Sequence, residues 1–255
     1  MRTLLIMQAR VLGALVLRET RATFGTSQLG YLWAILTPAA GVTVLASVFA
    51  AAGRHPPFGG SMALFFGTGL LTLEFFTKLS TSLMTTFNAN KALLTYPLIK
   101  ETDALCARLI LISATYVLIM LIFYSGLILM GLAEPPHHPE RLICAIGAVA
   151  MLGFGFGVIN AVILSQWDSW QYVYSIITRP LFIVSGIFFI PSRLPPRAGD
   201  VLRWNPVLHL VEWVRTGYYS NYDSAVLNRT YVISFALVLI LLGLAGERLT
   251  RKKRV

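Results

Sequence analysis

The sequence predicts an all-α integral membrane protein with six transmembrane helices, on three observations. Of its 255 residues, 56% are hydrophobic and only 13% are charged, which is about half the roughly 25% of an ordinary soluble domain. The mean hydropathy is +0.70. The apolar residues form continuous runs, each long enough for a helix to cross a hydrocarbon core of about 30 Å. These features exclude a soluble enzyme, a disordered segment and a membrane β-barrel.

In one membrane domain over residues 29–250, apolar runs place the spans at about 32–52, 61–82, 104–130, 142–165, 172–190 and 230–247. Glu74 and Lys78 stand four residues apart in the second span, in the order that favours an ion pair. Ionisable groups inside a membrane mark functional paths. Lys78 and Arg179 also have stems long enough to reach an interface, so both interpretations stay open. Residues 153–157 (GFGFG) have the Gly-x-x-x-Gly spacing of closely packed helices.

Residues 1–28 predict an amphipathic helix that lies on one face of the membrane. Its basic residues are interspersed with apolar positions near helical spacing, namely Leu4, Leu5, Val11, Leu12, Leu15 and Val16. Arg10 interrupts the apolar stretch and no small-residue cleavage site follows, which argues against a secretory signal. The alternative is a continuous extension of the first span.

The distribution of bases predicts that both termini are cytoplasmic. With six spans the termini share a side, whose segments hold twelve of the 21 Lys and Arg residues, against seven in the opposite loops. Lys and Arg favour the cytoplasmic side of a membrane. The net charge of +10 therefore indicates how the chain is oriented in the membrane, and it does not indicate nucleic-acid binding.

Two connections are longer than the others. Residues 84–103 lie on the cytoplasmic side, where Leu93, Leu94 and Leu98 form an apolar side and Pro97 divides the segment. Protruding leucines suit docking to a soluble partner, and the alternative is a short helix that rests on lipid.

The second long connection, residues 191–229, lies outside. Asn205 and Pro206 read as a helix cap followed by proline at the first helical position. His209, Glu212 and Trp213 then recur three or four residues apart and share a face. This pattern predicts a re-entrant, hairpin-like segment that dips into the outer leaflet, packed against protein.

The sequence lacks the motifs that mark several classes of enzyme. There is no P-loop, no GxSxG and no HExxH. His137 and His138 lie beside three prolines and lack a third ligand at helical spacing, so a solvated turn is favoured over a metal site. The chain is therefore expected to be a transport subunit, not an enzyme, with no cofactor of its own.

Two blocks of sequence carry a family resemblance. Residues 17–38 read LRETRATFGTSQLGYLWAILTP, and residues 185–189 (SGIFF) are followed by residues 204–206 (WNP). These blocks resemble ABC-2 type export permeases, and they are most similar to the inner-membrane subunit of capsular polysaccharide exporters.

The resemblance implies a homodimer of six-helix subunits in a bacterial inner membrane, with two copies of a cytoplasmic ATPase that binds ATP and Mg. It also implies a periplasmic co-polymerase, an outer-membrane export channel and an acidic, lipid-linked polysaccharide as substrate. Alternatives are export of O-antigen, teichoic acid or a drug, a glycan-modifying transferase centred on His137, His138, Glu134 and Glu140, and an ion-coupled carrier using Glu74.

Three groups of candidate site residues follow. The ATPase-coupling group comprises Arg18, Arg21, Asn88, Leu93, Leu94, Pro97 and Asp168. The substrate path is assigned to Phe65, Phe66, Glu74, Tyr116, Tyr124, Phe182 and Phe188, because sugar rings stack on aromatic faces. The exit side is assigned to Arg193, Arg203, Trp204, Asn205, His209, Glu212, Trp213 and Arg215, whose arginines, with Arg197, would attract an anionic polymer.

Overall fold

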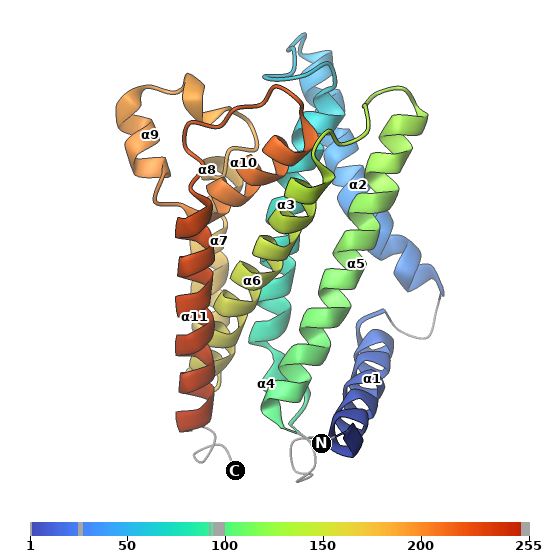
Figure 1. Ribbon diagram of the computed structural model, residues 1–255, viewed down its shortest axis with the longest axis vertical. Helices are drawn as coiled ribbons and strands as arrows, with labels where there is room; N and C mark the ends of the chain where they lie inside the picture. Colours follow the sequence, from blue (N-terminus) through green and yellow to red (C-terminus); the bar gives the residue numbers. More distant parts are fainter. Residues whose placement is uncertain (1, 25–27, 92, 94–99, 251–255) are drawn as a thin grey trace.

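The computed structural model describes residues 2–24, 28–91, 93 and 100–250, and the regular elements among them are helical. Five helices are long and apolar enough to cross a membrane. They run roughly along the long axis of the molecule (Figure 1), and they are α2 (Gln28–Ala51), α3 (Met62–Met84), α5 (Glu101–Leu129), α6 (Pro139–Leu164) and α11 (Arg229–Thr250). Each overlaps one of the six predicted spans.

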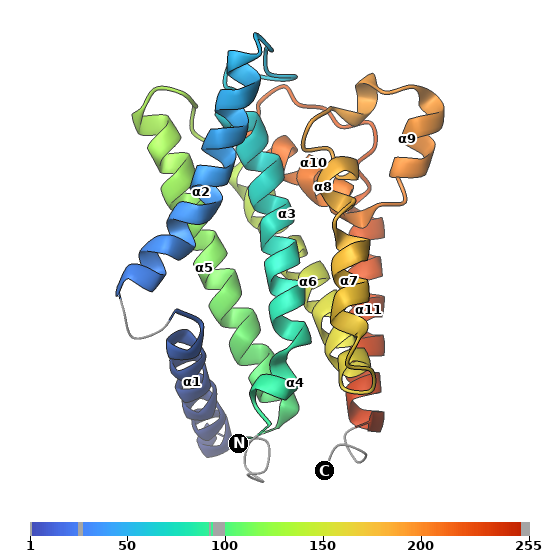
Figure 2. The same cartoon turned by 180° about the vertical axis from the view of Figure 1, so that it is seen from behind.

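Helix α1 (Arg2–Phe24) lies outside this bundle, beside the lower half of α5 (Figures 1 and 2). Both α1 and α3 have 23 residues, yet α1 is drawn much shorter in both views, so its axis is inclined to those of the long helices. Leu15, which was expected on the membrane-facing stripe, is only 5% exposed. The apolar stripe of α1 therefore packs at least partly on protein. The start of α1 and the end of α11 lie at the same end of the bundle, here called the terminal end; the opposite end is the distal end.

The predicted fifth span, residues 172–190, differs from expectation because it is not one helix. It contains α7 (Trp170–Thr178) and α8 (Leu181–Val184), separated by Arg179 and Pro180. Proline has no N–H to donate, and its ring clashes with the carbonyl four residues before it. Beyond α8 the chain bends at Gly186, where φ is +78°, and no further helix forms before Pro191.

The predicted outer segment, residues 191–229, contains three short helices at the distal end (Figure 1): η1 (Pro191–Arg193), α9 (Pro196–Leu202) and α10 (Pro206–Tyr218). Every residue of α10 after Pro206 is buried. This helix contacts α3, α6 and α11, so it closes the distal end of the bundle. Its depth in a bilayer stays a prediction.

The glycines of residues 153–157 pack α6 against two neighbours, as predicted. A Cβ added to Gly157 would lie 2.5 Å from Cβ of Leu83, and one at Gly153 would lie 2.9 Å from Cδ2 of Leu79, both on α3. A Cβ at Gly155 would lie 2.8 Å from Cβ of Leu239 on α11. Small residues thus let α6 approach α3 and α11 closely.

Candidate functional site

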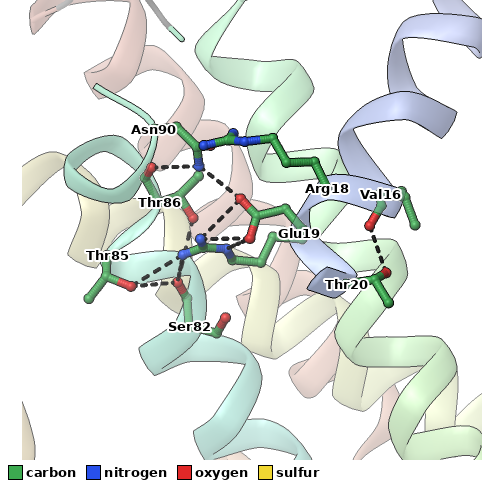
Figure 3. Close-up of polar contacts among 9 residues, drawn as sticks. Val16, Arg18, Glu19, Thr20, Ser82, Thr85, Thr86 and Asn90 are labelled. Carbon is green, nitrogen blue, oxygen red and sulfur yellow. Dashed lines mark hydrogen bonds and ion pairs between the residues drawn. The ribbon is translucent and has the colours of Figure 1, made fainter. Parts of the chain in front are cut away.

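A buried ion pair at the terminal end joins α1 to the bundle (Figure 3). The guanidinium of Arg108, on α5, donates from Nη2 to Oε2 of Glu19 at 2.8 Å and from Nε to the same oxygen at 3.1 Å. Asn90 follows α4 (Thr86–Ala89), and its Nδ2 donates to Oε1 of Glu19 at 2.9 Å. Arg18 completes the group by donating to Oδ1 of Asn90. Arg18, Glu19, Asn90 and Arg108 are here called the α1 clamp.

Arg108 also holds the end of α3. Its Nη1 donates to the carbonyl of Ser82 at 2.7 Å and to Oγ1 of Thr85 at 3.2 Å. The last carbonyls of a helix have no partner within the helix, and a cation there is favourable. A single guanidinium therefore connects α1, α3 and α5.

The α1 clamp is buried, which makes it costly to break. The side chains of Arg108 and Glu19 are 9% and 5% exposed, and Asn90 is 2% exposed. Removing one partner of such a pair leaves an uncompensated buried charge, which costs about 3–5 kcal/mol. A displacement of α1 is therefore expected to move α3 and α5 with it more readily than to break the clamp.

The clamp contains one of the predicted coupling residues, Arg18. Arg21, Asn88 and Asp168 are exposed and Leu93 is half-buried, whereas Leu94 and Pro97 lie outside the described residues. Sequence reasoning missed Glu19, Asn90 and Arg108. A usable signal was present, because Glu19 is the first acidic residue of the sequence, the next being Glu74, and it follows Leu12 and Leu15 at helical spacing.

A polar stripe runs along one face of α3. Glu74, Thr77 and Thr81 are partly exposed and Lys78 is exposed, at positions three or four residues apart. Within the described residues no ion pair joins Glu74 to Lys78. Ionisable groups within a candidate membrane helix are costly where they face lipid, which favours a position that water or a protein surface reaches. Figure 2 shows α3 between α2 and α7.

The predicted path aromatics divide into two sets. Phe65, Tyr116 and Tyr124 are buried among neighbouring helices, where Tyr116 stacks on Phe75 with ring centroids 5.3 Å apart. These three lie in the interior of the folded chain, as packing residues do.

The second set approaches the surface. The ring of Phe188 lies 5.9 Å from that of Phe66 and 5.1 Å from that of Phe182, measured between centroids. Phe182 is 39% exposed. Phe49 of α2, which the sequence did not single out, lies 5.9 Å from Phe188. Four rings thus lead from the interior to the face that carries α2 and α8.

At the distal end, Glu212 of α10 binds the chain that follows the helix. Its carboxylate accepts hydrogen bonds from the hydroxyls of Tyr222, at 2.7 Å, and Ser224, at 2.6 Å. Arg215 forms an ion pair with Glu212 at 3.3 Å. The Cζ atom of Arg215 lies 4.0 Å from the centre of the Phe65 ring, a cation–π contact.

This arrangement corrects one expectation. Arg215 was expected to attract a polymer at the exit surface, yet its side chain is 0% exposed. The guanidinium is enclosed by Phe65, Glu212 and the carbonyl of Phe189, to which Nη1 donates at 3.3 Å. Arg215 therefore holds the distal end together and presents no charge to the outside.

The other predicted exit residues separate into buried and exposed sets. Asn205 caps α10 as predicted: its Oδ1 accepts from the N–H of Val207 at 3.0 Å, and its Nδ2 donates to the carbonyl of Val184 at 3.2 Å. His209, Glu212 and Trp213 are buried, and Asn205 is partly buried. The exposed set comprises Arg193, Arg203 and Trp204.

His209 is held as a neutral imidazole. Its Nδ1 accepts from the backbone N–H of Asn228 at 3.2 Å, so that nitrogen is unprotonated. Its Nε2 faces the carbonyl of Arg203 at 2.8 Å and therefore carries the proton. Burial lowers the pKa of His209, against the opposing influence of that carbonyl and of Glu212.

The residues of the transferase alternative lie at the distal surface. Nε2 of His137 lies 3.2 Å from Oε2 of Glu134, with side chains 42% and 84% exposed. Both line a cavity of about 430 Å³ with Tyr218 and Tyr219. Within the described part of the chain, no group of three His, Cys, Asp or Glu side chains is placed to hold a metal ion.

Comparison with known proteins covers nearly the whole chain. Residues 10–219 match the ABC-2 type transporter family. The polysialic acid transport protein KpsM of Escherichia coli is 31% identical over 92% of this chain and 91% of its own. The capsule polysaccharide export inner-membrane protein CtrC of Neisseria meningitidis serogroup B is 28% identical, and BexB of Haemophilus influenzae, described in the same words, is 26% identical; each match covers 94% of this chain and 91% of the relative.

The family match covers well over half of the sequence, and it agrees with the five helices able to span a membrane that the described residues form. The chain belongs to the ABC-2 type transporter family of membrane transport proteins.

Proposed function

We propose that this protein is the permease subunit of an ATP-driven exporter that moves an acidic, lipid-linked capsular polysaccharide across a bacterial inner membrane. The observation that carries the proposal is similarity over more than nine-tenths of the chain to proteins named for capsule polysaccharide or polysialic acid transport. The chain binds no cofactor, because ATP and Mg bind a separate ATPase subunit, two copies of which serve a homodimer.

The terminal end is assigned to the cytoplasm. In this assignment α7 and α8 form the fifth crossing, so six crossings return the chain to the side where it began. The helical residues 170–184 span only about 22 Å at 1.5 Å per residue, less than a hydrocarbon core of about 30 Å. The fifth crossing is thus completed by the bent residues 185–190, and α10 is a re-entrant helix in the outer leaflet.

The substrate path is assigned to the face that carries the polar stripe of α3. Helices α2 and α7 flank this face, and both expose apolar side chains, such as Trp33 at 61% and Ile176 at 65%. In a homodimer that meets across this face, the apolar flanks pack together and the stripe of Glu74 and Lys78 borders a hydrated path. Phe182 and Phe188 then offer aromatic surfaces on which sugar rings slide.

The α1 clamp is assigned to coupling. A partner that binds α1 and residues 84–103 at the cytoplasmic face would push on Glu19 and Asn90, which Arg108 ties to α5 and to the end of α3. Closure of the ATPase would then change the spacing of the helices that border the path. At the distal end, the exporter would deliver polymer to a periplasmic co-polymerase and an outer-membrane channel.

Purification of the tagged protein from bacterial membranes tests this assignment. An ABC ATPase in equal amount with the chain is the expected result, and its ATP hydrolysis should rise when the polymer is added. A chain that purifies without an ATPase, from membranes of cells that are actively exporting capsule, would contradict the proposal.

A further inference from the structure

A basic pocket lies at the distal end, beside the first turns of α6 and α11. It has a volume of about 780 Å³, within the roughly 300–1,000 Å³ of typical ligand sites. Arg141, Arg203 and Arg229 line it, together with Trp204 and Tyr231. These five residues define the distal pocket.

Positive charge in the distal pocket is only partly compensated. Arg203 pairs with Asp200 at 2.9 Å, but Arg141 lies 4.0 Å from its nearest carboxylate oxygen, on Glu140. Arg229 has no ion pair among the described residues, and its Cζ lies 5.5 Å from the centre of the Trp213 ring.

Among the other lining residues, Asp223 and His209 are groups that can carry charge near neutral pH. Asp223 is a lining residue with a carboxylate. The neighbouring Glu212 is already engaged by Tyr222, Ser224 and Arg215. His209 also lines the pocket, and it is neutral because its ring accepts from one backbone group and donates to another. Asp200 and Glu140 lie beside Arg203 and Arg141 outside the lining, and Arg229 is left with no ion pair among the described residues. An anionic ligand that reaches Arg229 and Arg141 is therefore favoured.

The pocket lies where two candidate membrane helices begin. Arg141 is in the first turn of α6, and Arg229 opens α11. The ends of membrane helices lie at the depth of lipid headgroups, where Trp and Tyr are enriched. Trp204 is 74% exposed, and the hydroxyl of Tyr231 donates to its carbonyl at 2.8 Å.

An apolar track leads from the pocket along α11. Tyr231, Phe235, Val238 and Leu242 follow one another at spacings of four, three and four residues, which places them on one helix face. The rings of Tyr231 and Phe235 lie 5.8 Å apart, and Val238 and Leu242 are 52% and 61% exposed. The track has the length and character of a surface for an acyl chain.

We propose that the distal pocket binds the phosphate headgroup of an anionic phospholipid, with an acyl chain lying along Tyr231, Phe235, Val238 and Leu242. Arg141 and Arg229 hold the phosphate through charge-assisted hydrogen bonds, and Trp204 covers the headgroup. A carboxylated sugar of the exported polymer would satisfy the same charges. The apolar track favours the lipid.

Native mass spectrometry of the full-length protein tests the site without any substitution. Delipidated protein is titrated with phosphatidylglycerol, with phosphatidylcholine of the same chains, and with a carboxylated oligosaccharide. A clear preference for phosphatidylglycerol, undisturbed by excess oligosaccharide, is the expected result. Equal binding of the two lipids overturns the proposal, and so does displacement of phosphatidylglycerol by the oligosaccharide.

Substitutions then locate the site. R141Q/R229Q should weaken phosphatidylglycerol binding roughly thirtyfold, because each Arg near a membrane surface contributes about 1 kcal/mol toward anionic lipid. The control R193Q/R197Q removes two exposed arginines at the same end but outside the pocket, and should leave binding unchanged. R141K/R229K keeps both charges, so folded protein with retained binding is expected even if the glutamine variant unfolds. Equal losses in the Arg141/Arg229 and Arg193/Arg197 glutamine variants would show a diffuse charge effect and refute the site.

Discussion

Arg108 and Glu19 form a forked ion pair that connects helices whose residues are 89 positions apart in the sequence, with 2.8 Å between Nη2 and Oε2. The pair lies inside the protein although one partner belongs to a helix outside the bundle. The same guanidinium binds the last turn of α3. A structural role alone would hold α1 in place, whereas a coupling role also requires that force on α1 reaches the helices along the path.

Glu19→Ala tests whether the α1 clamp couples α1 to α3 and α5 or only holds α1 in place. The substitution leaves Arg108 buried without its carboxylate, at a cost of about 3–5 kcal/mol. We expect export to fall sharply while the ATPase still binds and hydrolyses ATP, since α1 then moves without α3 and α5. The control is Arg21→Ala, an exposed residue on the same helix. Normal export by folded Glu19→Ala protein would remove the clamp from the coupling pathway.

Lys78→Met and Glu74→Gln test the polar stripe of α3. Both remove a charge but retain most of the side chain, so packing changes little. If the stripe borders a hydrated path, each variant should assemble with its ATPase and export more slowly. Arg248→Met removes an exposed charge from the last turn of α11 and should have no effect. Wild-type export rates in both stripe variants would place the path elsewhere.

Arg215→Ala should destabilise the protein. The fully buried Glu212 would lose its cation, and Phe65 would lose the group that covers its ring. We expect the free energy of unfolding to fall by roughly 3–5 kcal/mol. Thermal unfolding in detergent measures this, with exposed Arg197→Ala as the control. A small loss of stability together with a specific loss of acidic-polymer export would instead restore an electrostatic role for Arg215.

We expect His209 to make the stability of the protein depend on pH. Its pKa is lowered from 6.5 because burial disfavours the charged ring. The unfolded chain therefore takes up this proton at higher pH than the folded protein does. The stabilisation is complete above pH 6.5 and declines as the pH falls from there through the folded-state pKa. Thermal unfolding between pH 7.5 and 5 should show a smaller decline in His209→Gln, and an equal decline in both proteins would exclude this residue as the cause.

The sequence predicted the structure best where a single local requirement determines the conformation of a segment. Apolar runs of membrane-crossing length predicted five helices that the structure contains. Asn205 and Pro206 predicted the start of α10, and the spacing of Gly153 and Gly157 predicted close approach of α6 to another helix. Each of these signals is local, and no distant residue can easily override it.

Interactions between distant segments were harder to predict. Pro180 divides the expected fifth span, and its local effect could have been anticipated from the sequence. The partners of Glu19 and Arg215, in contrast, depend on how helices far apart in the chain meet. Arg215 was therefore counted as an outer-face charge, although Phe65 and Glu212 enclose it. The role of a charged residue in a membrane protein can therefore be assigned only when its neighbours in the folded structure are known.

Transport by reconstituted protein tests the central claim most directly. Proteoliposomes containing the chain alone, the chain with its ATPase and ATP, or Glu19→Ala with the same ATPase are compared for entry of an acidic capsular glycolipid. Our account predicts transport in the second preparation, none in the first, and ATP hydrolysis with little transport in the third. Transport by the chain alone, or equal transport by the second and third preparations, would contradict it.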